Sequence, residues 1–314
     1  MSVFTGDDWA VILGGSSGFG LATAHKLAAH GMNLFIVHRD RRGAMKRIAP
    51  EFEKLKGSGV KVLTRNADAL ADDKRAELLA DLQQEMGETG RVRCLLHSIA
   101  FGNLKLIVPE KRRERTAPQQ LAARLGIEES ALVEAADALL AEGLDEVAEI
   151  STQPEYPAYS YLDAGDVART IHTMGTSLLD WVQDIHREGM FAADARTFGL
   201  TSEGNVLAWK GYAAVSAAKV ALEAVARSIA AEFAPYGVRC NVLQPGVTET
   251  QALAAIPGSA HLKAHARLRN PYGRLTTPPD VANVLYLMCL PEAAWINGEV
   301  IRVDGGEHIS GSTA

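Results

Sequence analysis

Residues 10–31 have the sequence AVILGGSSGFGLATAHKLAAHG: a short apolar run, a glycine-rich turn and a helical pattern that ends at Gly31. A strand, a glycine turn and a helix in this order form the context that a dinucleotide-binding fingerprint requires. Gly14 permits the tight turn, Gly18 lets the backbone approach a pyrophosphate, and Gly20 allows close helix packing. The helix N-terminus supplies N–H donors and a partial positive charge. The contacts expected from this turn are Gly14, Ser16, Ser17, Gly18, Phe19 and Gly20.

A second predicted strand, residues 33–37, is followed by the charged run HRDRR at residues 38–42. The end of this strand should lie beside the adenosine ribose of the dinucleotide. An acidic residue there would accept hydrogen bonds from the ribose 2′-hydroxyl, whereas an arginine fits a 2′-phosphate. The run contains both kinds of side chain, so Asp40 is compatible with NADH and Arg39 with NADPH.

An alanine-rich segment without glycine or proline, Tyr212 to Ala234, predicts a helix. Lys219 follows Tyr212 by seven residues, and Val215 occupies the position four residues before the lysine. Both spacings put a side chain on the lysine's face, but the rise is roughly 6 Å for four residues and about 10.5 Å for seven. A carbonyl reductase protonates the oxygen on the carbon that receives the hydride, whereas an enoyl thioester has its oxygen two bonds further along the conjugated system, and a phenol moved outward by one turn suits the second case. Taken alone, the pair also fits a helix-terminal aromatic and a solvated lysine.

The glycine spacing of residues 14–20 resembles the short-chain dehydrogenase/reductase family. Further landmarks appear in family order over residues 8–102 and 162–310: Asp68, the run CLLHSIAF (94–101), the strand VRCNVL (238–243) with the loop QPGVTET (244–250), and VIRVDGG (300–306). The resemblance implies an α/β fold, a doubly wound parallel sheet of the Rossmann type, formed as a single domain by residues 1–314.

Three features resemble the enoyl-acyl-carrier-protein reductase branch of this family. They are the seven-residue spacing from Tyr212 to Lys219, the tetrapeptide HSIA (97–100), and the run VTETQAL (247–253). The glycine spacing resembles the subgroup of that branch that prefers NADPH. The resemblance also places the phosphate-binding base at Arg39 and the usual acidic determinant at His38, which implies NADPH, with NADH as the alternative because of Asp40.

The resemblance implies a set of site residues. Tyr212 and Lys219 are the expected catalytic pair, with Ser202 ten residues before the tyrosine, where many enoyl reductases carry a second tyrosine and carbonyl-reducing relatives carry a polarising serine. Asp68 would contact adenine, or cap the following helix. His172 aligns with a family asparagine, and an ordinary helix-face histidine is the alternative. The dinucleotide contacts implied beyond the glycine turn are Arg39, Asp68, Ala69, Ser98, Ile99, Ala100, Lys219, Gly246, Thr248 and Thr250.

Composition is typical of a cytoplasmic enzyme. A chain of 314 residues that is 47% hydrophobic can bury one substantial core. A net charge of −6 gives no reason to expect nucleic acid or an anionic membrane as a partner. The three cysteines, Cys94, Cys240 and Cys289, fall in apolar patterns without metal-ligand spacing, so they predict reduced core residues and no metal. The amino terminus has no targeting pattern, and no run of about 18 apolar residues occurs.

Residues 103–161 are not covered by the resemblance. Their apolar spacing predicts two short amphipathic helices broken at Gly126, followed by a Pro- and Tyr-rich loop from Gln153 to Tyr161. Because this segment follows the fourth strand, whose carboxyl end faces the ligand crevice, we expect a helical insertion that forms a wall or lid over the substrate site. The basic run KRRER (111–115) is most simply a solvated loop, although it would suit an acidic acyl carrier protein.

The sequence therefore predicts an oxidoreductase that transfers hydride from NADPH to the C2=C3 bond of a trans-2-enoyl thioester, as in fatty acid biosynthesis. The acyl group would be carried by acyl carrier protein or coenzyme A, and the assembly would be a homodimer or homotetramer. One alternative is a carbonyl or 3-oxoacyl thioester reductase that uses Ser202. Another is a non-catalytic dinucleotide-binding regulator or scaffold, against which the presence of both Tyr212 and Lys219 argues.

Overall fold

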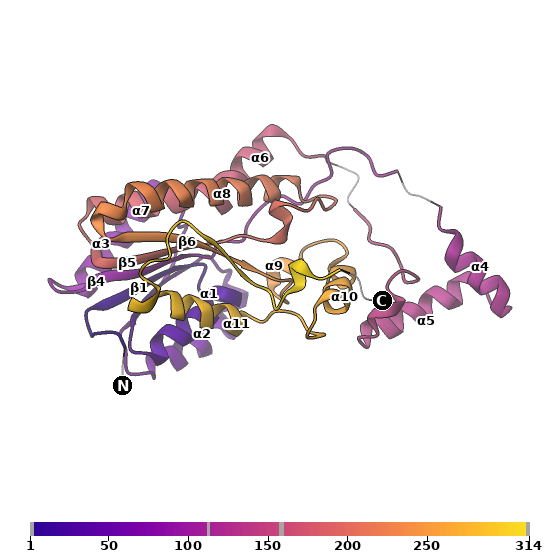
Figure 1. Cartoon of the computed structure of the whole chain (residues 1–314), viewed down its shortest axis with the longest axis horizontal. Coiled ribbons are helices and arrows are strands. Elements are labelled where there is room, and N and C mark those ends of the chain that lie inside the picture. Colours follow the sequence, from indigo (N-terminus) through magenta and orange to yellow (C-terminus); the bar gives the residue numbers. More distant parts are fainter. Residues whose placement is uncertain (1–2, 112–113, 157–159, 312–314) are drawn as a thin grey trace.

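The computed structural model describes residues 3–111, 114–156 and 160–311. Within them, seven parallel strands form one sheet in the order β3-β2-β1-β4-β5-β6-β7 (Figure 1). The strand order reverses between β1 and β4, and ligands of such sheets bind at the carboxyl ends of the strands at this switch point. The strands are β1 (Asp8–Leu13), β2 (Asn33–His38), β3 (Val62–Asn66), β4 (Arg91–His97), β5 (Phe191–Leu200), β6 (Val238–Pro245) and β7 (Val300–Val303). The predicted doubly wound sheet is confirmed.

Helices cover both faces of the sheet (Figure 1). One face carries α1 (Gly18–Ala29), α2 (Arg42–Lys56) and α11 (Pro278–Met288), and the other carries α3 (Asp72–Met86), α7 (Ser177–Arg187) and α8 (Ala213–Glu232). Alternate residues of each strand enter the two apolar cores, as Val11 and Ile12 of β1 do. Because both faces are covered, the central strands are almost wholly buried, which explains their uninterrupted apolar sequences.

The helix before α7 contains a wider turn. Helix α6 (Ala164–Ile171) continues into a π-helical turn, η2 (His172–Thr176), and then into α7. The turn packs against α8, where a Cβ on Gly175 would lie 2.7 Å from the carbonyl oxygen of Ala218. Gly175 therefore lets η2 approach α8 directly beside Lys219.

Helix α8 begins one residue after Tyr212, which occupies the N-cap position and follows Gly211 with a φ of +71°. Short elements lie at both ends of the strands. At the carboxyl ends are η3 (Glu203–Asn205), α9 (Gln251–Ala254), α10 (Ser259–Arg269) and η6 (Glu307–Ile309), whereas η4 (Ala234–Tyr236) and η5 (Pro291–Ala293) precede β6 and β7.

The segment after β4 has helices on both sides of Gly126, as expected: α4 (Thr116–Leu125) and α5 (Glu129–Ala141), followed by η1 (Asp145–Val147). Gly126 adopts a left-handed conformation that ends α4. Helices α4 and α5 project from one end of the molecule, beyond α10 (Figure 1). Residues 112–113 of the basic run and 157–159 of the Pro- and Tyr-rich loop lie outside the described residues. Among the helices described, none is long and apolar enough to cross a membrane.

Candidate active site

The turn between β1 and α1 depends on its glycines. A Cβ on Gly14 would lie 2.4 Å from the carbonyl oxygen of Ser98, and one on Gly20 would lie 2.3 Å from that of Gly14. Gly18 has a φ of +53°, and a Cβ there would meet only the Thr250 side chain, at 3.6 Å. Gly14 and Gly20 thus permit close backbone packing, while the space beside Gly18 admits a ligand.

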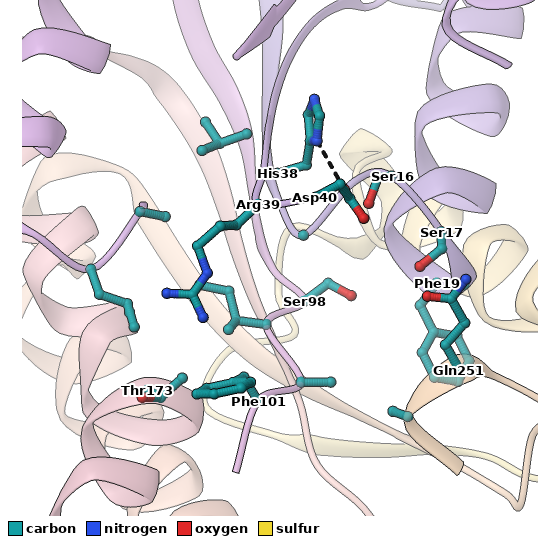
Figure 2. A pocket seen from close by; sticks show the side chains of 18 of the residues that line it. Ser16, Ser17, Phe19, His38, Arg39, Asp40, Ser98, Phe101, Thr173 and Gln251 are labelled. Carbon is teal, nitrogen blue, oxygen red and sulfur yellow. Dashed lines mark hydrogen bonds and ion pairs between the residues drawn. The ribbon is translucent and has the colours of Figure 1, made fainter. Parts of the chain in front are cut away.

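A cavity of about 300 Å³ lies along the carboxyl ends of β1 to β4, next to this turn (Figure 2). The indole N–H of Trp181 donates to the carbonyl oxygen of Ala69 at 2.9 Å and fixes one wall. The predicted dinucleotide contacts that line the cavity are Gly14, Ser16, Ser17, Gly18, Phe19, Arg39, Asp68, Ala69, Ser98, Ile99, Ala100 and Thr250. Because it joins a helix N-terminus to the switch point of the sheet, the cavity fits a dinucleotide.

Arg39 lies across the adenosine end of this cavity. Its guanidinium group pairs with Asp68 at 2.9 Å and stands 5.1 Å from the centre of the Phe101 ring. The side chain of Asp40 points toward Ser16 and accepts a hydrogen bond from Nδ1 of the buried His38 ring at 2.9 Å (Figure 2). Both candidate determinants of cofactor choice therefore lie in the cavity, one on each side.

Asp68 has a local role besides its contact with Arg39. Its second carboxylate oxygen accepts a hydrogen bond from the backbone N–H of Leu70 at 3.0 Å. The N-cap of α3 is Ala71, so the alternative that Asp68 caps this helix is wrong. Asp68 instead closes a turn and lines the cavity beside Arg39.

A second cavity of about 390 Å³ opens from the first and shares with it Phe19, Thr250 and residues 98–101. Its lining includes Ser202, Tyr212 and Lys219, together with Gly246 and Thr248 from the loop after β6. Apolar residues of the lining include Leu104, Met174, Trp209, Val215, Leu253, Ile256 and Leu262. The two predicted catalytic residues and the serine are therefore brought together in one largely apolar space beside the dinucleotide cavity.

Tyr212 is 8% exposed, and its hydroxyl oxygen lies 3.4 Å from that of Ser202. Burial raises the pKa of the Tyr212 phenol, so the phenol is a neutral hydrogen-bond donor at neutral pH. The ring packs edge-on against Trp209, with the centroids 5.2 Å apart, and a Cβ on Gly204 would lie 2.5 Å from it. The position of the hydroxyl is thus fixed by packing on both sides of the ring.

Lys219 is buried and donates a hydrogen bond from Nζ to the carbonyl oxygen of Leu200 at 2.8 Å. Burial lowers the pKa of Lys219 to about 8, while the nearby carboxylate of Glu223 opposes that shift. His97, the first residue of HSIA, hydrogen-bonds Ser177 at 2.8 Å, and burial lowers its pKa to about 3. At neutral pH the site therefore contains a mostly charged lysine and a neutral histidine.

His172 and Val215 differ in their relation to the site. The His172 side chain is 47% exposed, lies 3.9 Å from Asp180, and is outside both cavity linings as the described residues define them. Its neighbour Thr173 lines the dinucleotide cavity. Val215 lines the second cavity at the four-residue spacing from Lys219, where it offers a hydrocarbon surface and no proton donor.

Sequence reasoning missed a buried ionic network behind Ser202. Arg269 of α10 binds both carboxylate oxygens of Glu203, at 2.9 and 2.6 Å, and one oxygen of Glu307 at 2.8 Å. Glu307 also accepts a hydrogen bond from the backbone N–H of Val247 at 3.1 Å. Burial raises the pKa of Glu307, while Arg269 opposes that shift. The network joins η3, α10, η6 and the loop after β6 around the second cavity.

Three features define this protein as a nicotinamide-dinucleotide-binding oxidoreductase of the Rossmann type. They are the parallel sheet with its reversal of strand order, the glycine turn between β1 and α1, and the Tyr212–Lys219 pair. A family described as "Enoyl-(Acyl carrier protein) reductase" matches residues 130–308, and one described as "short chain dehydrogenase" matches residues 8–116. The first match covers more than half of the chain. The protein belongs to the short-chain dehydrogenase/reductase family and resembles its enoyl-acyl-carrier-protein reductase branch.

Two relatives from Aquifex aeolicus show the range of chemistry among similar proteins. The enoyl-[acyl-carrier-protein] reductase [NADH] FabI is 37% identical over 100 residues, which are 32% of this chain and 37% of the relative. The 3-oxoacyl-[acyl-carrier-protein] reductase FabG is 38% identical over 103 residues, 33% of this chain and 39% of the relative. The aligned stretch therefore spans little more than a third of each relative, and the comparison leaves the reaction open between the two.

A solved structure supports the fold. The crystal structure of the enoyl-[acyl-carrier-protein] reductase (NADH) from Aquifex aeolicus VF5 superposes with a TM-score of 0.71 at 19% identity. The superposition covers 97% of this chain and 97% of that chain.

Proposed function

We propose that this oxidoreductase is an NADPH-dependent enoyl thioester reductase. The proposal depends on which residues precede Lys219. Val215, four residues before the lysine, carries no proton donor, and the phenol in the second cavity is that of Tyr212, seven residues before Lys219. A donor moved outward by one turn suits charge that develops on a thioester oxygen three bonds from the carbon that receives the hydride, two bonds further than in carbonyl reduction.

The bound dinucleotide supplies a hydride, which adds to C3 as the C2=C3 bond breaks. Negative charge then spreads to the thioester oxygen. Tyr212 donates a hydrogen bond to that oxygen, and the ammonium group of Lys219 stabilises the charge and holds the nicotinamide ribose. The Tyr212 hydroxyl passes its proton to the enolate oxygen, the enol tautomerises so that C2 gains a hydrogen and the saturated thioester forms, and solvent reprotonates the phenolate. The residues of the chain thus contribute placement and charge stabilisation, in a space from which apolar side chains exclude water.

The apolar lining supports an acyl substrate. Leu104, Leu253, Ile256 and Leu262 offer hydrocarbon surface to an acyl chain, and each buried methylene contributes about 0.8 kcal/mol to binding. The carrier, acyl carrier protein or coenzyme A, stays a prediction, as do the cytoplasmic location and a homodimeric or homotetrameric assembly.

Preference for NADPH is supported by Arg39, whose guanidinium group lies at the adenosine end of the dinucleotide cavity. To bind a 2′-phosphate, this group would exchange Asp68 for the phosphate, which carries more charge and offers bidentate geometry. The competing observation is Asp40, which lines the same cavity and could accept hydrogen bonds from an unmodified ribose.

The second candidate function is reduction of a carbonyl, such as that of a 3-oxoacyl thioester. It is favoured by Ser202, whose hydroxyl lies 3.4 Å from that of Tyr212, so that both could reach one carbonyl oxygen. A regulator or scaffold that binds a dinucleotide without catalysis would not require the Tyr212 hydroxyl or the Lys219 charge.

Initial rates of NADPH oxidation with crotonyl and acetoacetyl thioesters test the proposal. We expect kcat/KM for the crotonyl thioester to exceed that for the acetoacetyl thioester by at least 100-fold, about 2.7 kcal/mol in transition-state stabilisation. A preference for the acetoacetyl thioester would favour the carbonyl reductase. No turnover of either, with tight NADPH binding, would favour the non-catalytic alternative.

A further inference from the structure

The helical insertion is attached to α10 at three points along that helix. At its start, Gly258 packs so closely against Pro154 that a Cβ on the glycine would lie 2.5 Å from the proline ring. One turn later, Nε2 of His261 and the hydroxyl of Ser151 share a hydrogen bond of 3.0 Å. Near the end of α10, Arg267 binds Asp145 of η1. The insertion thus follows α10 over most of its length.

The contact between Asp145 and Arg267 has the geometry of a strong charge-assisted pair. Nε and one terminal nitrogen of Arg267 donate to the two carboxylate oxygens, at 2.6 and 2.5 Å. Asp145 is 7% exposed, and its carboxylate raises the pKa of Arg267. A bidentate pair at a buried carboxylate fixes orientation as well as distance, so η1 and α10 are held in one register.

The charges of the two segments are complementary. Residues 116–150 contain eight acidic residues and one basic residue, Arg124. Helix α10 contains no acidic residue, and its basic and titratable side chains are His261, Lys263, His265, Arg267 and Arg269. Glu149 adds a second contact to the interface, with a carboxylate oxygen 3.3 Å from Nε2 of His265. Attraction between an acidic insertion and a basic helix therefore adds to the local contacts.

On its other side, α10 belongs to the active site. Leu262 lines the second cavity, and Arg269 joins Glu203 and Glu307 in the network behind Ser202. Among the described residues of the insertion, Leu104 lines this cavity, whereas none from α4, α5 or η1 does. Contact with α10 therefore gives these helices a route by which they can influence the substrate.

We propose, on the basis of the proposed function, that Asp145 is a positioning residue for acyl-chain selectivity. By holding Arg267 it fixes α10, and α10 holds Leu262 as a wall of the acyl cavity. Loss of the pair loosens that wall, which weakens binding of long acyl chains that reach it. Short chains and the dinucleotide lie nearer to Tyr212 and the glycine turn, so their binding is retained.

The test compares Asp145→Asn with Glu146→Gln, a control that removes the same charge from the next, exposed residue. The readout is the ratio of kcat/KM for a C12 thioester to that for the C4 thioester, with NADPH affinity measured alongside. We expect Asp145→Asn to lower the ratio at least fivefold through KM of the C12 substrate, and Glu146→Gln to leave it within twofold. Hydrogen exchange of residues 259–269 should become faster in Asp145→Asn alone.

Two further variants keep the test decisive. Arg267→Lys retains the charge but loses the bidentate geometry, so it should give a smaller loss of the ratio if Asp145→Asn proves too unstable to assay. The double variant Asp145→Arg with Arg267→Asp reverses the pair and should recover part of the ratio lost in either single variant. An unchanged ratio in Asp145→Asn or Arg267→Lys, with NADPH binding intact, overturns the inference.

The ratio is measured in both the enoyl and the 3-oxoacyl series. If the wild-type protein reduces only 3-oxoacyl thioesters, the proposed function is wrong, but the chain-length ratio in that series still tests the role of Asp145. If enoyl reduction is confirmed and the ratio does not respond, the proposed function stands and the inference fails.

Discussion

The hydroxyl oxygens of Tyr212 and Ser202 lie 3.4 Å apart in a cavity that also contains the ammonium group of Lys219. Their separation brings both within reach of one substrate oxygen. Tyr212 extends from the start of α8, and Ser202 from the segment that follows β5. The two candidate reactions differ in which of these hydroxyls stabilises the negative charge. A thioester enolate and a reduced carbonyl develop that charge at different distances from the carbon that accepts the hydride.

Replacing Tyr212 with Phe keeps the ring and removes the hydroxyl. Because Trp209 and Gly204 fix the ring, we expect the fold and cofactor binding to survive. Loss of a preorganised donor should lower kcat with an enoyl thioester by on the order of 100-fold or more. Ser202→Ala should lower it less than about tenfold. Near-normal turnover in Tyr212→Phe together with collapse in Ser202→Ala would reverse the assignment in favour of the carbonyl reductase.

Arg39→Ala tests cofactor preference. If the guanidinium group binds the 2′-phosphate, its loss should weaken NADPH by about 1.5 to 3 kcal/mol, toward the lower end because Arg39 is half exposed. NADH affinity should change little. Fluorescence titrations of both cofactors measure the difference, and equal weakening of the two would show that Arg39 does not recognise the phosphate.

The pKa of Lys219, lowered to about 8 by burial, predicts opposite trends of activity and stability with pH. Above pH 8 the folded protein loses the ammonium charge, so kcat/KM should fall as pH rises from 8 to 9.5. Between pH 8 and the usual lysine pKa of about 10.4, the unfolded chain binds more protons at this residue, so its contribution to the free energy of unfolding rises with pH.

Denaturant titrations at several pH values compare the wild type with Lys219→Met, which cannot titrate. The difference in the free energy of unfolding between the two proteins should shift in favour of the wild type as pH rises through that window. A pH-independent difference would mean that Lys219 keeps an ordinary pKa in the folded protein.

Gly204→Ala should disturb catalysis through the Tyr212 ring. The added methyl would stand 2.5 Å from that ring, so the ring must shift and carry the hydroxyl out of position. We expect kcat to fall at least tenfold, since small displacements of catalytic groups are costly. Gly43→Ala, in α2 with open space around the new methyl, is the matched control. If both variants keep wild-type kcat, precise placement of the ring is unimportant.

The features that could be predicted from the sequence are those specified by the local order of apolar and glycine residues. Strand, glycine turn and helix follow one another over residues 8–29, and their order depends on contacts between near neighbours. The gathering of Ser202, Tyr212 and Lys219 was expected from the family resemblance, and the geometry agrees. Strand boundaries were less accessible: β5 begins at Phe191, and its first residues are only partly buried and lack a strong apolar pattern.

Side-chain partners distant in sequence could not be predicted. Asp145 and Arg267 are 122 residues apart, and neither carries a local signal for the other. His172 illustrates a different limit. The π-helical turn at residues 172–176 adds a residue to a turn, which rotates the following face by about 100°. Thr173 lines the dinucleotide cavity, while His172 is half-exposed.

The most direct test of enoyl reduction is the destination of the hydride. NADPH carrying deuterium at the transferred position of its nicotinamide is incubated with the protein and an equimolar mixture of crotonyl and acetoacetyl thioesters, and the products are analysed by mass spectrometry and NMR. We predict butyryl thioester with deuterium at C3 and unreacted acetoacetyl thioester. Deuterium at C3 of a 3-hydroxybutyryl thioester, with the crotonyl thioester unconsumed, would contradict enoyl reduction.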